Sequence, residues 1–294
     1  MKNRISTCPV CSSRDCTLRH KVQNFKYITC LTCGTVRIDP FPTACEVAAW
    51  YTIDNYYHNK DRNIGYTDYE SLKPGLIKTS EKRFAKALHP EALRNASVLE
   101  LGCGPGCTAE ALKKFRNIEY LGVDPNPQAI DSIRKLGFKG EVGTIKDIDT
   151  SRKFDHIIFF DVLEHIIDPN HFFSYLNTHL KPSGTLLFTT PNTTSLLSKI
   201  SGARWVSYIV PQHVLLYNPQ SIYRLLVNHG YSNIKFFSDF QWVGLDFVLN
   251  RLGDLGDLIF PLKWIEKAGS GFLKKLPFVS VPNGNMLVFA DKNN

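Results

Sequence analysis

Four cysteines near the N-terminus have the residue type and the spacing of a metal site. They form two Cys-x-x-Cys pairs, Cys8 with Cys11 and Cys30 with Cys33, and 18 residues separate the pairs. Each pair can present two thiolates to one side, and four sulfur ligands give the tetrahedron that Zn²⁺ prefers. One pair alone would suit a redox dithiol, whereas two pairs at this spacing favour a structural zinc ribbon. With four protein ligands, the metal would keep no open position for catalysis.

A glycine-rich segment has the pattern of a nucleotide-binding loop. Residues 98–106 read Val-Leu-Glu-Leu-Gly-Cys-Gly-Pro-Gly, in which an apolar strand with an acidic residue, Glu100, runs into a turn and then a helix. Glycines let the backbone approach a ligand closely above a helix N-terminus. The third glycine follows the second by two residues rather than three, which departs from the dinucleotide fingerprint. Asp124 ends the next strand, where it can accept both ribose hydroxyls of a nucleoside or cap the following helix.

Candidate acid–base residues follow two later strands. Asp161, Glu164 and His165 stand at positions i, i+3 and i+4 of a predicted helix start, so all three can point toward one pocket. His213 precedes a helix start at Asn218, and a neutral imidazole there can take a proton from a hydroxyl or an activated carbon. The alternatives are that one carboxylate caps the helix and that His213 is a surface residue of a loop.

An alternation of apolar strands and helical segments must position these residues. Strands are expected at 97–101, 119–123, 155–160, 185–189, 234–237 and 285–290, with a weaker one near 140–142. Helices are expected at 107–115, 127–136, 168–180 and 218–229. The alternation is typical of βαβ units, whose parallel strands bring their loops to one carboxyl edge. We therefore predict a doubly wound α/β fold with a mostly parallel seven-stranded sheet and a small N-terminal zinc ribbon.

The motifs taken together resemble the class I S-adenosylmethionine-dependent methyltransferases, which have a Rossmann-like fold. The resemblance covers about residues 70–294 and is carried by ELGCGPG, VDPN, FDHIIFFDVLEHIIDP and SGTLLFTTPN. The four-cysteine ribbon, the segment 39–43 and the run Asn55-Tyr56-Tyr57 resemble bacterial methyltransferases of sugar, surface-polysaccharide and lipid pathways. Some of those enzymes act on nucleotide-linked deoxysugars.

The resemblance implies a set of cofactor-binding residues. Asp124 would hold the ribose, and Asp161 would face the amino end of the cofactor. Many relatives have an aspartate where Thr144 stands, so adenine recognition falls to backbone groups near Thr144 and Ile145, or to Asp147. The pocket on the methionine side would be formed by the loop residues Glu100, Gly102, Cys103, Gly104 and Gly106.

The resemblance also implies catalytic roles for Asp161, Glu164, His165 and His213. In quinone-type O-methyltransferases and small-RNA 2′-O-methyltransferases, a similar Glu-x-x-Glu-His binds a divalent ion. Here the first position is Asp161, and an ion at Glu164 and His165 is one interpretation. A helix-capping element, as in methyltransferases without a metal, is the other. In related sugar and quinone enzymes a histidine at the position of His213 lines the substrate pocket, and Asn192 is a further candidate for that pocket.

The composition excludes several classes of protein. The 294 residues are 43% hydrophobic and 21% charged, which excludes a disordered chain, a collagen and a small disulfide scaffold. No apolar run approaches the roughly 18 residues of a membrane span, and the N-terminus shows no apolar signal core. Eight cysteines without a secretory signal indicate reduced thiols or metal ligands. We therefore expect a cytoplasmic protein.

Three parts of the chain are expected from these patterns. They are a zinc ribbon at 1–42, a helical linker and lid at 43–90, and a methyltransferase domain at 91–294. The last part contains a helical insertion at 239–283, with short amphipathic helices at 245–249, 255–265 and 272–276. These helices fit a lid or a dimer contact, and their lysine and apolar faces also fit a peripheral contact with a membrane.

The charge distribution bears on the acceptor. Residues 1–90 carry 14 Lys and Arg against 8 Asp and Glu, whereas residues 91–294 carry 21 against 19. A basic module of this modest size suits a phosphate of a nucleotide-sugar, a lipid or RNA. We expect methyl transfer to a hydroxyl or carbon of a sugar, polysaccharide or lipid precursor. The alternatives are an RNA methyltransferase with the ribbon as reader, and a cofactor-binding protein without catalysis.

Overall fold

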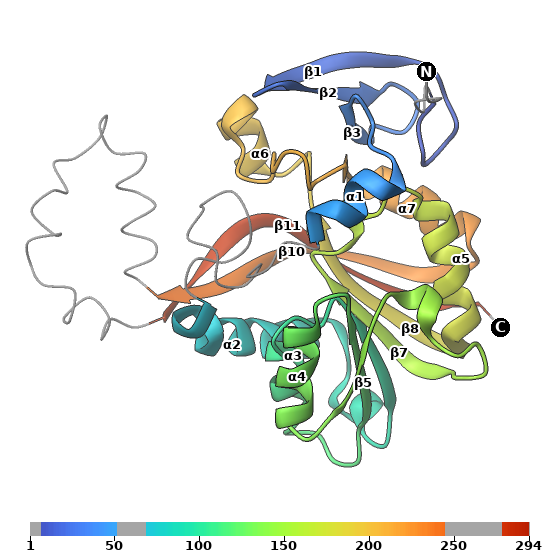
Figure 1. The fold of residues 1–294 in the computed structure, drawn as a ribbon, viewed down its shortest axis with the longest axis vertical. Helices are drawn as coiled ribbons and strands as arrows, with labels where there is room; N and C mark the ends of the chain where they lie inside the picture. Colours follow the sequence, from blue (N-terminus) through green and yellow to red (C-terminus); the bar gives the residue numbers. More distant parts are fainter. Residues whose placement is uncertain (1–6, 52–68, 245–277, 294) are drawn as a thin grey trace, which may run out of the picture.

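The structure is a computed structural model that describes residues 7–51, 69–244 and 278–293, and it contains two sheets (Figure 1). The larger sheet has seven strands in the order β10-β11-β8-β7-β4-β5-β6. Neighbouring strands from β8 to β6 are parallel, whereas β11 is antiparallel to both β8 and β10. The strands are β4 (Ser97–Leu101), β5 (Glu119–Asp124), β6 (Lys139–Val142), β7 (Phe154–Phe160), β8 (Leu180–Pro191), β10 (Tyr231–Gly244) and β11 (Phe278–Lys292). The predicted fold class is confirmed.

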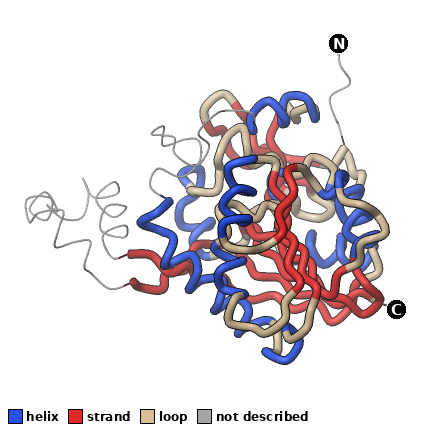
Figure 2. The backbone as a smooth tube through the Cα atoms, turned by 60° about the horizontal axis from the view of Figure 1, so that its bottom comes forward, coloured by secondary structure: helices blue, strands red, loops and turns tan. Residues whose placement is uncertain are grey.

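Helices cover both faces of this sheet (Figure 2). The central strands are apolar on both sides, so alternate residues enter two different cores: Leu99 and Ile157 one, Val98 and Ile158 the other. On the first face lie α5 (Pro169–His179) and α7 (Pro219–Asn228), and on the second α2 (Tyr69–Ala87), α3 (Cys107–Leu112) and α4 (Pro127–Lys135). Shorter elements are α1 (Ala44–Tyr51), α6 (Leu196–Ser201) and single 3₁₀ turns at Pro90–Leu93, Ile145–Asp147, Leu163–His165 and Gly202–Arg204.

The hairpin of β10 and β11 is longer than its sequence pattern indicates. The expected strands covered only 234–237 and 285–290, and residues 239–244 and 278–283 were assigned to a helical insertion. In the structure these residues pair as strands, from Phe240 opposite Pro282 to Gly244 opposite Phe278. Tertiary contact explains the difference, because Trp242 donates its backbone N–H to the Thr79 hydroxyl of α2 (2.8 Å). The amphipathic helices predicted at 245–249, 255–265 and 272–276 lie outside the described residues.

The smaller sheet contains the predicted ribbon and one strand from elsewhere. Its order is β1-β2-β3-β9, with every neighbouring pair antiparallel. The strands are β1 (Cys16–Val22), β2 (Phe25–Cys30), β3 (Val36–Asp39) and β9 (Leu215–Leu216). Because β9 follows the segment that contains His213, the ribbon sheet includes a piece of the part predicted at 91–294. Tyr27 and Ile38 of the ribbon belong to the same buried core as Tyr217.

No helix among residues 7–51, 69–244 and 278–293 has both the length and the apolar character that crossing a bilayer requires. Helix α5, for example, has eleven residues, whereas a span needs about 20.

A buried ion pair joins α2 to the β10–β11 hairpin. The Arg83 guanidinium donates to both carboxylate oxygens of Asp239, at 3.0 and 2.6 Å, and the side chains are 9% and 2% exposed. Asn283 of β11 donates to the same carboxylate (2.8 Å). The guanidinium also lies over the ring of Phe160, 4.4 Å from its centroid. Planar, two-point pairing of this kind needs arginine and would be lost with lysine.

We predict that Asp239→Ala lowers the free energy of unfolding by about 3–5 kcal/mol, because it removes the carboxylate that accepts two hydrogen bonds from the buried Arg83 guanidinium. Urea unfolding followed by circular dichroism measures the change. The matched control is Glu91→Ala, which removes the surface pair with Arg94, whose side chains are 64% and 56% exposed. That variant should lose at most about 1 kcal/mol. Equal losses in the two variants would contradict the prediction.

Candidate active site

The carboxyl ends of β4 and β7 define the position of the candidate site. The chain proceeds from β4 to β5 on one side and from β7 to β8 on the other. Loops that leave adjacent strands in opposite directions open a crevice, and ligands of doubly wound sheets bind there. The loop after β4 contains the glycines at 102–106, and the turn after β7 contains Asp161, Glu164 and His165. The structure therefore brings the two predicted groups to one edge.

The three loop glycines all have positive φ, but they serve different contacts. Their φ values are +66° at Gly102, +49° at Gly104 and +94° at Gly106. A Cβ atom on Gly102 would lie 2.6 Å from Val162, and one on Gly106 would lie 2.7 Å from Leu136, the residue that caps the end of α4. The first and third glycines thus permit close packing against the neighbouring loop and helix. Gly104 donates its N–H to the carboxylate of Asp124 (2.9 Å).

Asp124 holds the glycine loop and the start of the next segment together. It is 4% exposed and accepts from the backbone N–H groups of Gly104 and Asn126, at 2.9 Å each. Asn126, whose side chain accepts from the N–H of Gln128, is the residue that caps α4. The helix-capping alternative for Asp124 is therefore wrong. Its place at the end of β5 is the one predicted for the ribose contact.

Glu100 and Cys103 lie below the loop. Glu100 is 2% exposed and accepts a hydrogen bond from the Tyr120 hydroxyl. Burial raises the pKa of Glu100 to about 8, so a nearby cation would favour its ionised form. Cys103 is buried, and a Cβ on Gly122 would lie 2.9 Å from its sulfur. The residues present here suit a ligand with positive charge.

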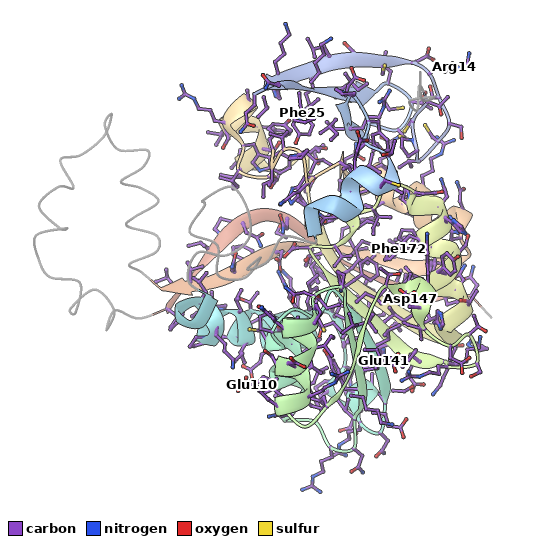
Figure 3. The ribbon with its side chains drawn as sticks, viewed as in Figure 1. Arg14, Phe25, Glu110, Glu141, Asp147 and Phe172 are labelled. Atoms are coloured by element: carbon purple, nitrogen blue, oxygen red, sulfur yellow. The ribbon has the colours of Figure 1, made fainter. Side chains whose placement is uncertain are left out.

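The turn after β6 occupies the place predicted for adenine recognition. Thr144 donates its N–H and hydroxyl to the carboxylate of Asp147, at 2.7 and 2.9 Å, which makes a capping box. Asp147 is labelled in Figure 3. Gly143 donates its N–H to the Asp124 carbonyl (3.0 Å) and so ties this turn to the end of β5. Asp147 therefore orders the turn, while Ile145 is buried beside it.

Glu164, His165 and His213 form a compact cluster of possible ligands. The potential ligand atoms of these three residues all lie within 4.8 Å of one another. The imidazole rings of His165 and His213 meet edge to face, with centroids 4.8 Å apart. The Glu164 carbonyl accepts from the N–H of Val214 (2.9 Å), which joins the turn after β7 to the segment before β9. The structure thus unites two motifs that lie about 50 residues apart in the sequence.

Backbone carbonyls determine the tautomers of both histidines. Nδ1 of His165 lies 3.1 Å from the Gln212 carbonyl, and Nδ1 of His213 lies 2.8 Å from the Ser207 carbonyl. Because a carbonyl only accepts, Nδ1 carries the proton in each ring and the lone pair is on Nε2. Burial lowers the pKa of His165 to about 4. Burial and the neighbouring His165 lower the pKa of His213 well below its usual value, so both rings are neutral at pH 7.

The carboxylates of Glu164 and Asp161 have separate partners. The Thr190 hydroxyl donates to Glu164 (3.0 Å), and burial together with Asp161 raises the pKa of Glu164 well above its usual value. Asp161 accepts from the Thr189 hydroxyl (2.9 Å) and from the Asn285 amide (2.7 Å). Consecutive residues of a strand point to opposite faces, so β8 holds the two carboxylates apart.

The local backbone differs from the helix predicted at Asp161–His165. Asp161 has φ of +55°, residues 163–165 form a 3₁₀ turn, and α5 begins only at Pro169. A proline at that first helical position and the side-chain cap from Asp168 explain the later start. The Asn192 side chain accepts from the N–H and hydroxyl of Thr194 and closes a turn, and its contact with the acceptor stays a prediction.

Two residues of the site, Arg83 and Thr190, were not identified from the sequence. Arg83 lies close enough that its charge opposes the burial that raises the pKa of Glu100 and Asp161. No sequence signal separates it from the other basic residues of its helix. Thr190 could have been identified, because it stands at the end of an apolar strand, next to the carboxyl edge of the sheet where the site was expected.

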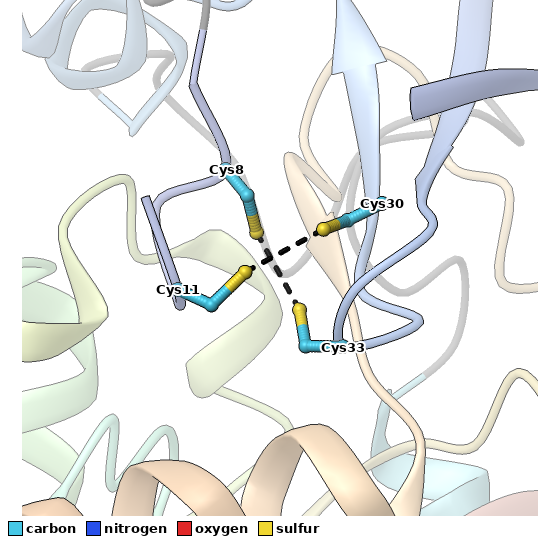
Figure 4. A group of neighbouring side chains, drawn as sticks. All are labelled: Cys8, Cys11, Cys30 and Cys33. Atoms are coloured by element: carbon cyan, nitrogen blue, oxygen red, sulfur yellow. Dashed lines mark hydrogen bonds between the residues drawn. The ribbon is translucent and has the colours of Figure 1, made fainter. Parts of the chain in front are cut away.

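The four ribbon cysteines fit a zinc ion. Sulfur atoms of Cys8 and Cys33 lie 3.6 Å apart, and those of Cys11 and Cys30 lie 3.5 Å apart (Figure 4). A tetrahedral site with Zn–S bonds of about 2.3 Å has sulfur–sulfur distances of about 3.8 Å. The predicted group is therefore brought together with the spacing that zinc requires. The Cys33 carbonyl also accepts from the Asn218 side chain (3.4 Å), which connects this knuckle to α7.

Known proteins similar to this chain are methyltransferases. A family model described as a methyltransferase domain matches residues 76–235. The ubiquinone biosynthesis O-methyltransferase of Bradyrhizobium diazoefficiens is 29% identical over 123 residues, which are 39% of this chain and 48% of that protein. The enzyme of the same name from Coxiella burnetii is 31% identical over 129 residues, 41% of this chain and 55% of that protein. The chain spans about half the length of the curated relatives it matches.

A solved structure has a fold similar to that of this chain. The S-adenosylmethionine-dependent methyltransferase from Archaeoglobus fulgidus has a TM-score of 0.51 and 22% sequence identity to this chain. The match covers 76% of this chain and 98% of that one. The likeness extends over the seven-stranded part and confirms the fold class that the motifs predicted.

We predict one zinc ion per chain, measured by plasma mass spectrometry of the purified protein. Cys33→Ser should lose the metal and destabilise the ribbon sheet, because structural zinc contributes directly to folding. Cys16→Ser is the matched control, since Cys16 lies on β1, is exposed and does not belong to the four-sulfur group. Zinc absent from the wild type, or present at full stoichiometry in Cys33→Ser, would be incompatible with this assignment.

Proposed function

The chain belongs to the methyltransferase domain family, and from this premise we propose that it transfers the methyl group of S-adenosylmethionine to a hydroxyl of a small organic acceptor. The observation that carries the proposal is that Gly102 of the glycine loop packs close to Val162, in the turn that leads to two clustered neutral histidines, His165 and His213. The names of the curated relatives support oxygen as the methylated atom. The acceptor class we propose is a sugar, polysaccharide or lipid precursor, in line with the ribbon motif.

The residues around the loop fit the cofactor. S-adenosylmethionine supplies an electrophilic methyl group on a positively charged sulfur. Asp124 is proposed to hold the ribose, and the turn at Thr144–Ile145 to cover the adenine. The buried carboxylate of Glu100, with its raised pKa, becomes fully ionised beside a positive charge and so favours a cationic ligand over a neutral one. This preference helps release the neutral product of the cofactor after transfer.

We propose that His213 is the general base. Its Nε2 accepts the proton of the acceptor hydroxyl while the oxygen forms its bond to the methyl carbon and the carbon–sulfur bond breaks. The Ser207 carbonyl, which holds the proton on Nδ1, also stabilises the imidazolium that results. A base placed in this way contributes typically about 10²–10⁴ in rate. Glu164 and His165 shape the pocket beside it, and Asp161 faces the cofactor edge.

A second candidate for the same site is a divalent cation held by Glu164, His165 and His213. The observation that favours it is the compact cluster of one carboxylate and two neutral imidazoles. A buried carboxylate with a strongly raised pKa gains most from a cation beside it. A bound divalent ion would lower the pKa of an acceptor hydroxyl. In that case His165 and His213 act as ligands, and the Thr190 hydroxyl orients the third ligand, Glu164.

The remaining expectations also stand as proposals. We assign acceptor contact to the ribbon at 1–42 and the linker and lid at 43–90, beside the catalytic part at 91–294. A cytoplasmic location and a peripheral membrane contact through the segment 245–277 stay predictions. The modest excess of positive charge gives the RNA alternative little support.

We predict that Gly104→Val abolishes S-adenosylmethionine binding, because a branched side chain fills the space beside Asp124. Asp124→Ala should weaken binding at least tenfold, about 1.4 kcal/mol, by removing the ribose acceptor. Isothermal calorimetry measures both, with circular dichroism to check folding. Asp131→Ala is the control, since Asp131 is an exposed residue of the neighbouring helix α4. Unchanged affinity in both loop variants would overturn the cofactor site.

We predict that His213→Ala lowers turnover by roughly 10²–10⁴ while cofactor affinity stays within twofold. Methyl transfer from labelled cofactor to pools of nucleotide-sugars, lipid precursors, catechols and RNA identifies the acceptor and gives the rate. His171→Ala, an exposed histidine of α5, is the control. Treatment of the wild type with EDTA then separates the two candidates. Activity that is lost and returns with Mg²⁺ or Mn²⁺ supports the cation, whereas indifference supports the base.

A further inference from the structure

Arg19 of the ribbon bonds to two points of the segment that leads to His213. Its Nε donates to the Tyr208 hydroxyl (2.9 Å), and its Nη2 donates to the Thr193 carbonyl (3.0 Å). The Thr193 carbonyl and the Tyr208 hydroxyl lie at the two ends of the connection that contains α6. Helix α6 lies below β1 in Figure 1. One planar guanidinium thus closes a loop of about 15 residues.

Tyr208 is fixed by aromatic neighbours as well as by Arg19. Its ring lies 4.4 Å from that of Tyr27 in the ribbon and 5.4 Å from that of Trp205, centroid to centroid. Tyr208 is 7% exposed and Trp205 is 2% exposed. Packing therefore sets the direction of the Tyr208 hydroxyl. The bond to Arg19, which lies on β1, makes the position of Tyr208 depend on the position of that strand.

The residues next to Tyr208 orient both histidines of the cluster. Ser207 supplies the carbonyl that accepts from Nδ1 of His213, and Gln212 supplies the carbonyl that accepts from Nδ1 of His165. The N–H of His213 donates to the Ile209 carbonyl (2.8 Å), which closes the turn 207–213. Both imidazoles therefore depend on the placement of one short turn.

The other end of this turn is also bound to the ribbon. The N–H of Ile38 on β3 donates to the Val214 carbonyl (3.1 Å), and β3 pairs with β9 immediately afterwards. His213 thus lies between one anchor at Tyr208 and another at Val214. The second anchor consists of backbone bonds, whereas the first consists of side-chain contacts of Tyr208, in which Arg19 provides the hydrogen bond.

We propose that Arg19 is a positioning residue for His213, and that through it the zinc ribbon orients the catalytic site. By holding Tyr208, Arg19 keeps the Ser207 carbonyl under Nδ1 of His213, so that Nε2 faces the acceptor. This inference rests on the proposed function of His213. It predicts that the ribbon affects turnover through the geometry of the turn 207–213, separately from zinc binding and from the stability of the fold.

The test compares Arg19→Gln and Tyr208→Phe with the wild type. Each removes the bond between Arg19 and the Tyr208 hydroxyl, while Arg14→Gln, on the exposed rim of the same ribbon (Figure 3), is the matched control. We expect turnover to fall at least tenfold in the two variants, with zinc content, cofactor affinity and Tm close to those of the wild type. Zinc loss or a lowered Tm together with the fall in turnover would mean a merely structural role and would overturn the proposal.

Nitrogen NMR of ¹⁵N-histidine-labelled protein gives a readout that does not depend on activity. The wild type should show His213 protonated at Nδ1 alone, and the two variants should show a mixture of tautomers. An unchanged tautomer with unchanged turnover would overturn the proposal. A changed tautomer in variants of unchanged turnover would leave the positioning intact and would contradict instead the catalytic role of His213.

A double variant separates positioning from other effects of Arg19. In the His213→Ala background, Arg19→Gln should cause no further loss of turnover, because residues that act through one group are not additive. A further tenfold loss in the double variant would show that Arg19 acts by another route and would contradict the proposal.

Discussion

The change in connection direction between the parallel neighbours β4 and β7 is the constraint on which the rest of the site depends. The chain leaves these neighbouring strands toward opposite edges of the sheet, so the backbone itself does not fill the space above them. Local turn chemistry then sets each side chain around that space. Glycines at 102 and 106 bring the first loop close to Val162 and α4. The 3₁₀ turn at 163–165 directs Glu164 and His165 toward the segment before β9.

The electrostatics of the site follow from burial. Burial raises the pKa of Glu100 to about 8 and that of Glu164 well above its usual value. It lowers the pKa of His165 to about 4, and burial together with the neighbouring His165 lowers the pKa of His213 well below its usual value. Carboxylates that tend to be neutral and histidines that have lost their protons make a site of low net charge. Such a site favours cations, and the lone pairs of its imidazoles are not occupied by protons at pH 7.

Local sequence patterns predicted the fold and much of the site, whereas contacts distant in the chain were not predicted. The strand at 97–101, the glycine loop and the paired cysteines are each specified by neighbouring residues, so periodicity and spacing suffice. The strand β9 has only two residues and exists because β3 lies beside it. The pairs Arg83–Asp239 and Arg19–Tyr208 join residues more than 150 positions apart. Nothing local distinguishes these arginines from solvated ones, and the role of Asp161 depends likewise on Asn285 of a distant strand.

The pairing of β3 with β9 also affects the order in which parts of the chain fold during synthesis. β3 ends at Asp39 and β9 begins at Leu215, so about 175 residues are synthesised between them. At roughly 5–20 residues per second, a nascent chain carries an unpaired β3 edge for about 10–35 s. The cysteines at 8–33 have all emerged by then, so the metal can fold the three-stranded part first. Charged residues of its outer strands, Lys21 on β1 and Arg37 on β3, discourage pairing with another chain during this interval.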